Sequence, residues 1–248
     1  MRRVLKPRRV VFAAALLTAA AALAGCDKEP ADAAAPPPKP ELEFVYTADG
    51  GATDPDDKLT IYNRGTQPVA PVLKFIAIDE AGKPIPTVTV HAALGTDTGR
   101  VVVPAGGQAH DYLQFYGDGF QRTADLDVEV VRGTAVTYPA VRVAPTATAL
   151  NAAGAELRSG ARAKPMGVAK KVRLTNENDV AITVRYAYVV WNEQTENIDS
   201  FHMTYSPDDL ITVPARGHVD VDLEGEALAL NLQHGVALPA SVEAYYSV

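Results

Sequence analysis

The sequence holds a single cysteine in 248 residues, so no intramolecular disulfide can form. Positive charge is also scarce, because 30 Asp and Glu residues outnumber 23 Lys and Arg residues and give a net charge of −7. This balance argues against nucleic-acid binding, and we expect no nucleic-acid partner. Apolar residues nevertheless make up 47% of the chain, which excludes wholesale disorder.

Helical periodicity and catalytic motifs are missing as well. Beyond residue 40, no stretch repeats apolar residues at helical spacing over three convincing turns. The nearest candidates are 147–158, where Asn151 and Gly154 favour a linker or strand, and 224–233, where a helical turn fits. The chain has no GxSxG, P-loop or strand-to-helix GxGxxG motif, so we expect no enzyme and no cofactor.

Residues 1–25 have the layout of an export signal. Five basic residues and no acidic one are followed by an apolar run from Val10 to Ala24. The run is shorter than the roughly 20 residues of a transmembrane helix. Arg8 to Phe12 loosely resembles a twin-arginine signal, which would change the export route and not the anchor. We predict a signal peptide over residues 1–25.

The apolar run ends in Leu23-Ala24-Gly25-Cys26, which resembles the bacterial lipobox. The resemblance covers only the first 26 residues, and it implies cleavage before Cys26. A diacylglyceryl thioether on Cys26 and an acylated amine would supply the several acyl chains, palmitate among them, that stable anchoring needs. The alternative is an ordinary secretory signal with a chance cysteine near its end.

Residues 26–40 form a predicted tether. The stretch DKEPADAAAPPPKP is rich in Pro and Ala, favours polyproline II, and reaches roughly 40 Å when extended. Residues 1–25 hold five of the 23 basic residues and no acidic one, so the mature chain carries a net charge of −12. Such a body is not attracted to anionic lipid, and we expect the lipid alone to hold it at the membrane.

From residue 41 onward, short β-branched and aromatic runs alternate with Gly, Pro, Asn and Asp. This pattern predicts an all-β fold of sandwich or barrel type. The expected strands of the first part are 42–46, 59–62, 72–78, 87–92, 101–103, 112–116 and 126–131.

The chain also repeats itself at offsets of 110 to 114 residues. Lys58–Asn63 matches Lys171–Asn176, and the corner Val103-Pro104-Ala105-Gly106-Gly107 matches Val213-Pro214-Ala215-Arg216-Gly217. Further matches join 69–75 to 180–186 and 128–130 to 242–244. Each copy has the usual size of an immunoglobulin-like sandwich. We predict two tandem immunoglobulin-like β-sandwiches, over residues 41–145 and 146–248.

The motif Phe75-Ile76-Ala77-Ile78-Asp79, followed by Gly82-Lys83, resembles the FxLYD-type bacterial domain over roughly Leu59 to Phe115. The chain departs from the family at Ala77 and Ile78, where the family prefers Leu and Tyr. The second copy lacks the aspartate. The resemblance implies an immunoglobulin-like envelope module without known catalytic residues.

Two groups of polar residues are candidate ligand sites. His110-Asp111 and His218/Asp220 follow the same corner in the two copies, and His91 and His202 are the remaining possible donors. A zinc or copper site needs three or four converging ligands, and no HxH or HxxxH spacing is present, so we expect no metal. The acidic loop with Asp49, Asp54, Asp56 and Asp57 lacks the DxDxDG spacing of a calcium loop, which favours a solvated turn.

Aromatic residues gather at 112–120 and at 186–191, with Phe201 and Tyr205 nearby. They either fill the two cores, the favoured interpretation, or form an exposed strip for contact with protein or glycan.

The sequence as a whole predicts a non-catalytic, lipid-anchored envelope protein that faces the periplasm or the cell exterior and serves as an interaction or structural module. Its expected partners are the membrane, through Cys26, and an envelope protein that the sequence does not identify. The alternative is a lipoprotein that binds a metal or a glycan.

Overall fold

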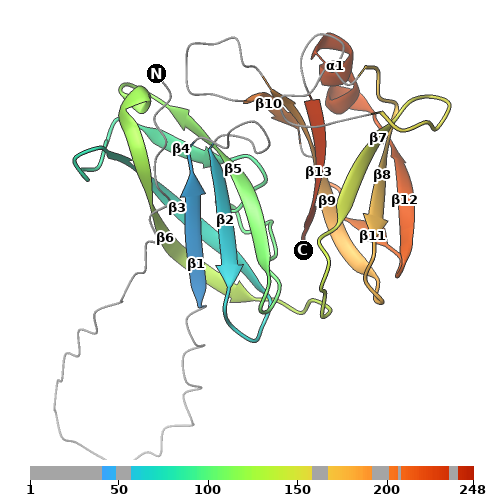
Figure 1. Cartoon of the computed structure of the whole chain (residues 1–248), viewed down its shortest axis with the longest axis horizontal. Coiled ribbons are helices and arrows are strands. Elements are labelled where there is room, and N and C mark those ends of the chain that lie inside the picture. Colours follow the sequence, from blue (N-terminus) through green and yellow to red (C-terminus); the bar gives the residue numbers. More distant parts are fainter. Residues whose placement is uncertain (1–40, 49–56, 158–166, 192–200, 206–207, 235–239) are drawn as a thin grey trace, which may run out of the picture.

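The computed structural model describes residues 41–48, 57–157, 167–191, 201–205, 208–234 and 240–248. Within these ranges the chain forms β-strands and one short helix, which confirms the all-β prediction (Figure 1). No helix in these ranges is long and apolar enough to cross a membrane.

The first half of the chain, residues 41–135, forms two facing antiparallel sheets. One sheet has the order β1 (Leu42–Thr47), β2 (Lys58–Asn63), β5 (Gln108–Tyr116) and β4 (Thr89–Ala92). The other pairs β3 (Val69–Asp79) with β6 (Thr123–Ala135), which follows the short 3-10 helix η1 (Phe120–Arg122). A cluster that includes Leu59, Ile61, Phe75 and Leu113 fills the space between the sheets.

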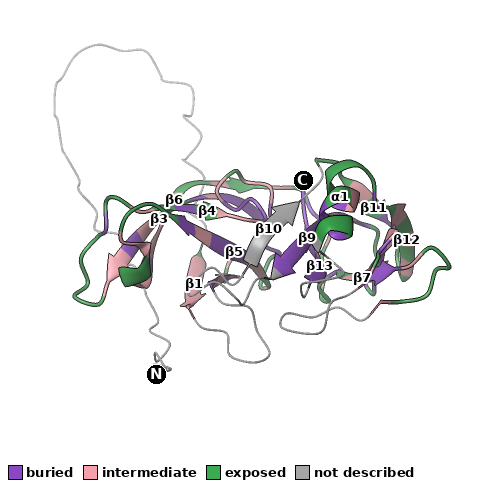
Figure 2. Ribbon diagram, turned by 90° about the horizontal axis from the view of Figure 1, so that it is seen from above, coloured by how far each residue is buried: buried purple, intermediate pink, exposed green. Residues whose placement is uncertain are grey.

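The second half, residues 146–248, repeats this arrangement. One sheet has the order β12 (Gly217–Asp222), β8 (Lys171–Asn176) and β7 (Thr146–Leu150). In the other, β9 (Ile182–Trp191) pairs with β13 (Ala240–Tyr246), with β10 (Phe201–Tyr205) and with β11 (Ile211–Val213). The helix α1 (Gly225–His234) precedes β13, where the sequence favoured a helical turn. Buried strand residues, drawn purple in Figure 2, concentrate in β9 and β13.

Strand alternation explains why the two copies match. β2 and β8 have the same burial pattern, in which every second side chain, beginning with Leu59 and Val172, points into a core. Both strands end in a buried asparagine, Asn63 and Asn176. Lys74 of β3 is exposed within an apolar run, because alternation along the strand turns this position to the solvent side.

The Val-Pro-Ala-x-Gly corner is a turn in both copies. Gly107 N donates to Pro104 O at 3.0 Å, and Gly217 N donates to Pro214 O at 3.2 Å. Gly106 and Arg216 occupy the same place with φ of 62° and 52°. A left-handed conformation costs little for glycine and more for arginine. Arg216 is held there by its backbone bond to Asn178 O at 2.9 Å and by its ion pair with Asp179 at 2.7 Å.

The copies differ in the strand that follows the third. β4 pairs with β5 in the first half, whereas β10 pairs with β9 in the second half. The same sequence position therefore belongs to opposite sheets of the two sandwiches. His91 lies on β4, and His202 falls at the register shift between Phe201 and Met203 of β10, so the two histidines are not structural equivalents.

The connecting segment, residues 136–145, packs on the second half. Val136, Tyr138 and Val141 contact the second core, and Tyr138 Oη donates to Thr183 O. The rings of Tyr138 and Tyr246 meet edge to face with centroids 5.4 Å apart. The sequence-based boundary at residue 145 remains a prediction, and these contacts show that residues 136–145 contribute to the second core.

The two halves meet at a buried seam, which we define by the cluster Leu94, Val101, Tyr112, Ala187, Val189 and Tyr245. Each of these side chains is at most 4% exposed. Backbone contacts reinforce the seam, because Val102 N donates to Tyr246 O at 2.9 Å and Ser247 Oγ donates to Arg100 O at 2.7 Å. Val102 itself packs into the second core. The halves therefore form a continuous apolar contact.

The seam leads to a prediction for the isolated first half. A fragment of residues 41–145 should unfold cooperatively, because its own core between the two sheets lies apart from the seam. It should also melt at a lower temperature than the whole chain and bind a hydrophobic dye, because Leu94, Val101 and Tyr112 lose their cover. Circular dichroism during heating and dye fluorescence measure both effects. A disordered spectrum would mean that the halves share one core.

Candidate functional site

Cys26 and the whole tether 26–40 lie outside the described residues, as do Asp49, Asp54 and Asp56 of the acidic loop. Of that loop, Asp57 is described. It is 1% exposed, adopts a φ of 53°, and its Oδ1 accepts a hydrogen bond of 2.6 Å from Tyr46 Oη. Asp57 O also accepts a bond of 2.9 Å from Leu113 N. These contacts tie Asp57 to β1 and β5, which is a structural role.

Asp111 is the most deeply buried carboxylate of the described residues, at 0% exposed. Its Oδ1 accepts hydrogen bonds from Leu94 N at 2.7 Å and Tyr112 N at 2.8 Å, and its Oδ2 accepts one from Thr96 N at 3.0 Å. Burial raises the pKa of Asp111 to about 6, and the backbone hydrogen bonds limit the rise. The carboxylate thus fastens the loop 94–96, which carries part of the seam, to β5.

The second histidine–aspartate pair has a different environment. Asp220 of β12 lies opposite Arg173 of β8. The Arg173 guanidinium donates to the two carboxylate oxygens of Asp220 at 2.8 and 2.9 Å. The hydrogen bond and charge of Arg173 lower the pKa of Asp220. His218 lies opposite Thr175 at the same sheet. The pairs His110-Asp111 and His218/Asp220 therefore do not form two copies of one ligand site.

The remaining histidine of the first half is also separated from His110. His91 of β4 lies opposite Gln114 of β5, and His110 is itself a residue of β5. Gln114 and His110 are four positions apart, so the two histidines are separated by about 13 Å along the strand direction. His91 Nδ1 lies 4.0 Å from Asp97 Oδ2, and the rings of His91 and Tyr116 meet edge to face with centroids 5.7 Å apart. Among the described residues, no group of three or more His, Cys, Asp or Glu side chains is placed to hold a metal ion.

The aromatic residues divide between core, seam and surface. Phe115 belongs to the first core, Tyr186 and Tyr188 belong to the second, and Tyr112 lies in the seam. Tyr116 is 49% exposed, and it is the one aromatic residue among the exposed large apolar residues of the described part of the chain. The side chain of Trp191 is outside the described set. The described aromatics mainly fill cores, and they do not form an exposed strip.

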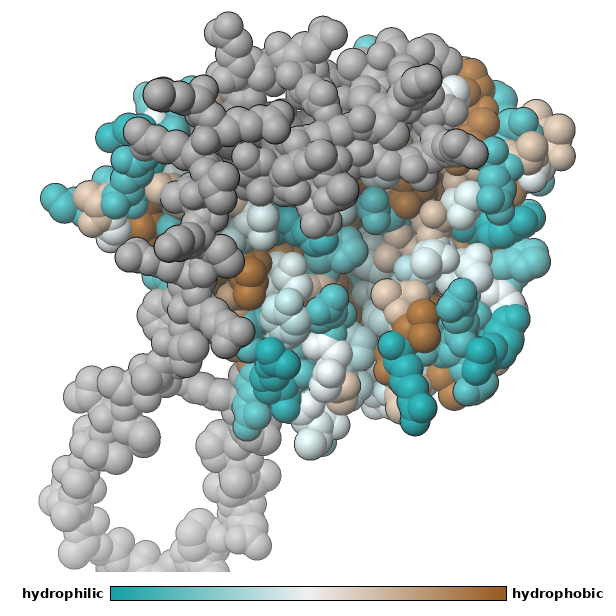
Figure 3. Space-filling view, in the orientation of Figure 1, coloured by the Kyte–Doolittle hydropathy of each residue, from teal (hydrophilic) through white to brown (hydrophobic). Residues whose placement is uncertain are grey.

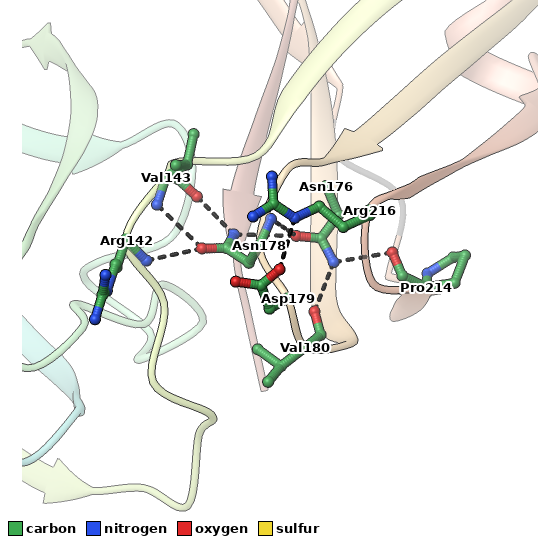
Figure 4. Close-up of polar contacts among 8 residues, drawn as sticks. All are labelled: Arg142, Val143, Asn176, Asn178, Asp179, Val180, Pro214 and Arg216. Atoms are coloured by element: carbon green, nitrogen blue, oxygen red, sulfur yellow. Dashed lines mark hydrogen bonds and ion pairs between the residues drawn. The ribbon is translucent and has the colours of Figure 1, made fainter.

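A pair of amides in the second half holds the connecting segment. Asn178 Oδ1 accepts hydrogen bonds from Arg142 N at 2.7 Å and Val143 N at 3.1 Å, and its Nδ2 donates to Val143 O at 2.8 Å (Figure 4). Asn176 Oδ1 accepts from both Asn178 N and Asn178 Nδ2. The position equivalent to Asn178 in the first half is Gly65, which has no side chain for such a contact. The sequence repeat includes Asn176, but it identified neither Asn178 nor the segment that Asn178 binds.

The outer edge of β6 has no partner among the strands that the structure describes. β6 pairs with β3 alone among the described strands, and it lies on the side of the first half that faces away from the second half (Figure 1). Edge strands expose backbone N–H and C=O groups that can accept a further strand. The sequence predicted a strand at 126–131, but it did not predict that this strand would pair on one side only among the described strands.

The sandwich of the first half is also less closed beside this edge. Phe44 and Tyr46 of β1 and Val128 and Val130 of β6 pack against the first core while remaining only partly buried. In the second half the corresponding edge strands pack against each other, and Val242, Ala244 and Tyr246 of β13 are at most 7% exposed. We call the edge of β6 together with Phe44, Tyr46, Val128 and Val130 the open edge.

On the face shown in Figure 3, hydrophobic residues are scattered among hydrophilic ones outside the grey region. No protein-family model matches the chain, and neither a curated protein nor a solved structure matches it. The function is therefore inferred from the sequence and from the geometry described above.

Proposed function

We propose that this protein is a lipid-anchored module of the bacterial cell envelope, which binds another envelope protein and performs no catalysis. The observation that carries the proposal is the position of the only cysteine, Cys26, at the end of the apolar run 10–24 and in a lipobox-like sequence. The acyl groups would hold the chain at the membrane, and the Pro-rich residues 27–40 would hold the folded part away from it.

The geometry of the polar residues supports an interaction module. Asp111 binds backbone amides, Asn176 and Asn178 bind turns and the connecting segment, and Asp220 binds Arg173. Each of these groups has a structural partner, as expected of groups that maintain a fold. The division into two immunoglobulin-like domains is part of the proposal, and the repeated sheets, corners and buried asparagines support it.

The substitution Cys26→Ser tests the anchor. The serine hydroxyl does not form the thioether, so we expect acyl labelling to be lost and the membrane-bound fraction to fall by at least about tenfold. Labelled fatty acid and cell fractionation measure the two effects. Lys28→Ser is the matched control, because it lies two residues away and leaves the cysteine in place. Acyl labelling that persists in the Cys26→Ser chain would refute the proposed function.

A further inference from the structure

We propose that the open edge of the first half accepts an extended strand from a partner protein, and that this strand alternates apolar and basic side chains. The inference deepens the proposed function by naming the chemistry of the partner, and it rests on that function for the cellular setting. Its test does not need the anchor, so the two proposals can fail separately.

The backbone of β6 provides the first element of the argument. Residues 125–130 form a regular ladder with β3 on one side, while no described strand pairs with the other side. The ladder shifts register between Val130 and Arg132, which leaves Val131 extra on β6 and 59% exposed. A second register shift, between Thr123 and Asp125, leaves Ala124 extra on β6. Bulges interrupt pairing, so the edge available for an added strand is about six residues long.

The apolar side chains beside this edge favour apolar residues on the core-facing side of the added strand. Leu126, Val128 and Val130 point towards the first core, and the last two remain partly buried. Phe44 and Tyr46 approach the same side of the sandwich from β1 and are also partly buried. An added strand beside β6 would place every second side chain against these groups and would complete their burial.

The acidic outward face of β6 favours basic residues on the solvent-facing side of the added strand. Asp125, Asp127 and Glu129 point outward, where their neighbours on β3 are Ile78, Ile76 and Lys74. Lys74 forms an ion pair of 3.4 Å with Glu129. The two aspartates face isoleucines across the ladder, so this stripe keeps an excess of negative charge. Directly opposed charges of opposite sign stabilise a strand pair, and like charges destabilise it.

The same charge argues against the occupants that the protein itself could supply. A second copy pairing through β6 would bring two acidic stripes together, which is unfavourable. The tether 27–40 contains Pro30, Pro36, Pro37, Pro38 and Pro40, and proline lacks the N–H that a ladder needs. Residues 49–56 contain three aspartates and no basic residue. A basic strand from another protein is the occupant that the charges favour.

The outer edge of β12 shows why charge excess matters. β12 is also an edge strand with acidic residues on its outward face. However, Asp220 pairs with Arg173 at 2.8 Å and Asp222 pairs with Lys171 at 3.3 Å, directly across the ladder. The charge of β12 is thereby compensated within its own sheet, so β12 serves as a matched control.

The experiment uses the full mature chain with Cys26→Ser, which lacks the lipid. The probe is a fluorescent octapeptide of alternating valine and lysine, and its binding is followed by anisotropy at low salt. We expect the double variant Asp127→Lys/Glu129→Lys to weaken binding at least tenfold, and Asp222→Lys to change it less than twofold. Hydrogen exchange should slow within residues 125–130 at the amides that point away from β3 when the peptide is added, because strand pairing protects backbone amides.

Three results would overturn the proposal. The first is equal binding of a peptide with the same charge and a proline at its centre, because attraction would then not require a ladder. The second is protection of amides outside 125–130 alone, or binding that Asp222→Lys weakens as much as the double variant does. The third is slow exchange at the outward amides of 125–130 without peptide that becomes fast after deletion of residues 27–40, because the tether would then be the occupant.

Discussion

Asn176→Ala is expected to lower the free energy of unfolding by about 3 kcal/mol, because it removes the centre of a buried corner. Asn176 is 1% exposed. Its Nδ2 donates to Val180 O at 2.8 Å and Pro214 O at 3.0 Å, and its Oδ1 accepts from Asn178 N at 2.9 Å. Alanine leaves these buried groups without partners. For a chain of this size, the melting temperature should fall by roughly 6–12 °C.

Asn63→Ala is the matched comparison in the first half. Asn63 makes the same kind of corner, with Nδ2 donating to Gln67 O at 2.7 Å and Val103 O at 3.1 Å, and Oδ1 accepting from Gly65 N at 2.9 Å. It orients no second amide, because glycine occupies the place of Asn178. We therefore expect a smaller loss for Asn63→Ala, of about 2 kcal/mol.

The pair Asn176 and Asn178 should also behave as a unit. Asn176 Oδ1 fixes the Asn178 amide, which in turn binds Arg142 and Val143 of the connecting segment. The double variant Asn176→Ala/Asn178→Gly should therefore lose less stability than the two single variants added together. Urea denaturation of the four chains measures this coupling. Strict additivity, or a loss below about 1 kcal/mol for Asn176→Ala, would contradict the role assigned to the corner.

Much of the fold could be predicted because its signals are local. The expected strand 59–62 lies within one residue of each end of β2, and its repeat match Lys171–Asn176 coincides with β8. The repeat could be recognised in the sequence because β2 and β8 both bury every second side chain. The Val-Pro-Ala-x-Gly corner was identified because it occurs in both copies, and its proline lacks the N–H donor that a central ladder needs.

The remaining features depend on contacts that are distant in the sequence. Nothing local distinguishes β4, which pairs with β5, from β10, which pairs with β9. His110 and His218 follow the same corner, yet Asp111 is buried and Asp220 lies at the surface beside Arg173. The seam joins Val101 to Ser247 across 146 positions of the chain. Composition and spacing do not contain this information, and so the candidate sites were predicted less well than the strands.

Asp111 makes the stability of the protein depend on pH in a direction opposite to that of most aspartates. Burial raises its pKa to about 6 in the folded chain, against an ordinary value of 3.8. Between these two values the folded state binds more protons than the unfolded state, so the free energy of unfolding falls as the pH rises. The full contribution is present below pH 4 and is lost as the pH passes 6. It amounts to about 3 kcal/mol.

Asp111→Asn tests this assignment by removing the titrating group at nearly constant shape. The variant should lose most of the decline between pH 4 and 6, while Asp220→Asn, at a surface carboxylate whose pKa is lowered, should retain it. A residual slope of the same sign is expected from Glu243, since burial raises its pKa as well. Asp111→Asn should also be less stable than the parent at pH 4.5, because its amide group cannot accept the hydrogen bonds from all of Leu94, Thr96 and Tyr112. Urea denaturation at pH 4.5, 5.5, 6.5 and 7.5 measures the profile, and an unchanged slope in Asp111→Asn would show that another group carries the pH dependence.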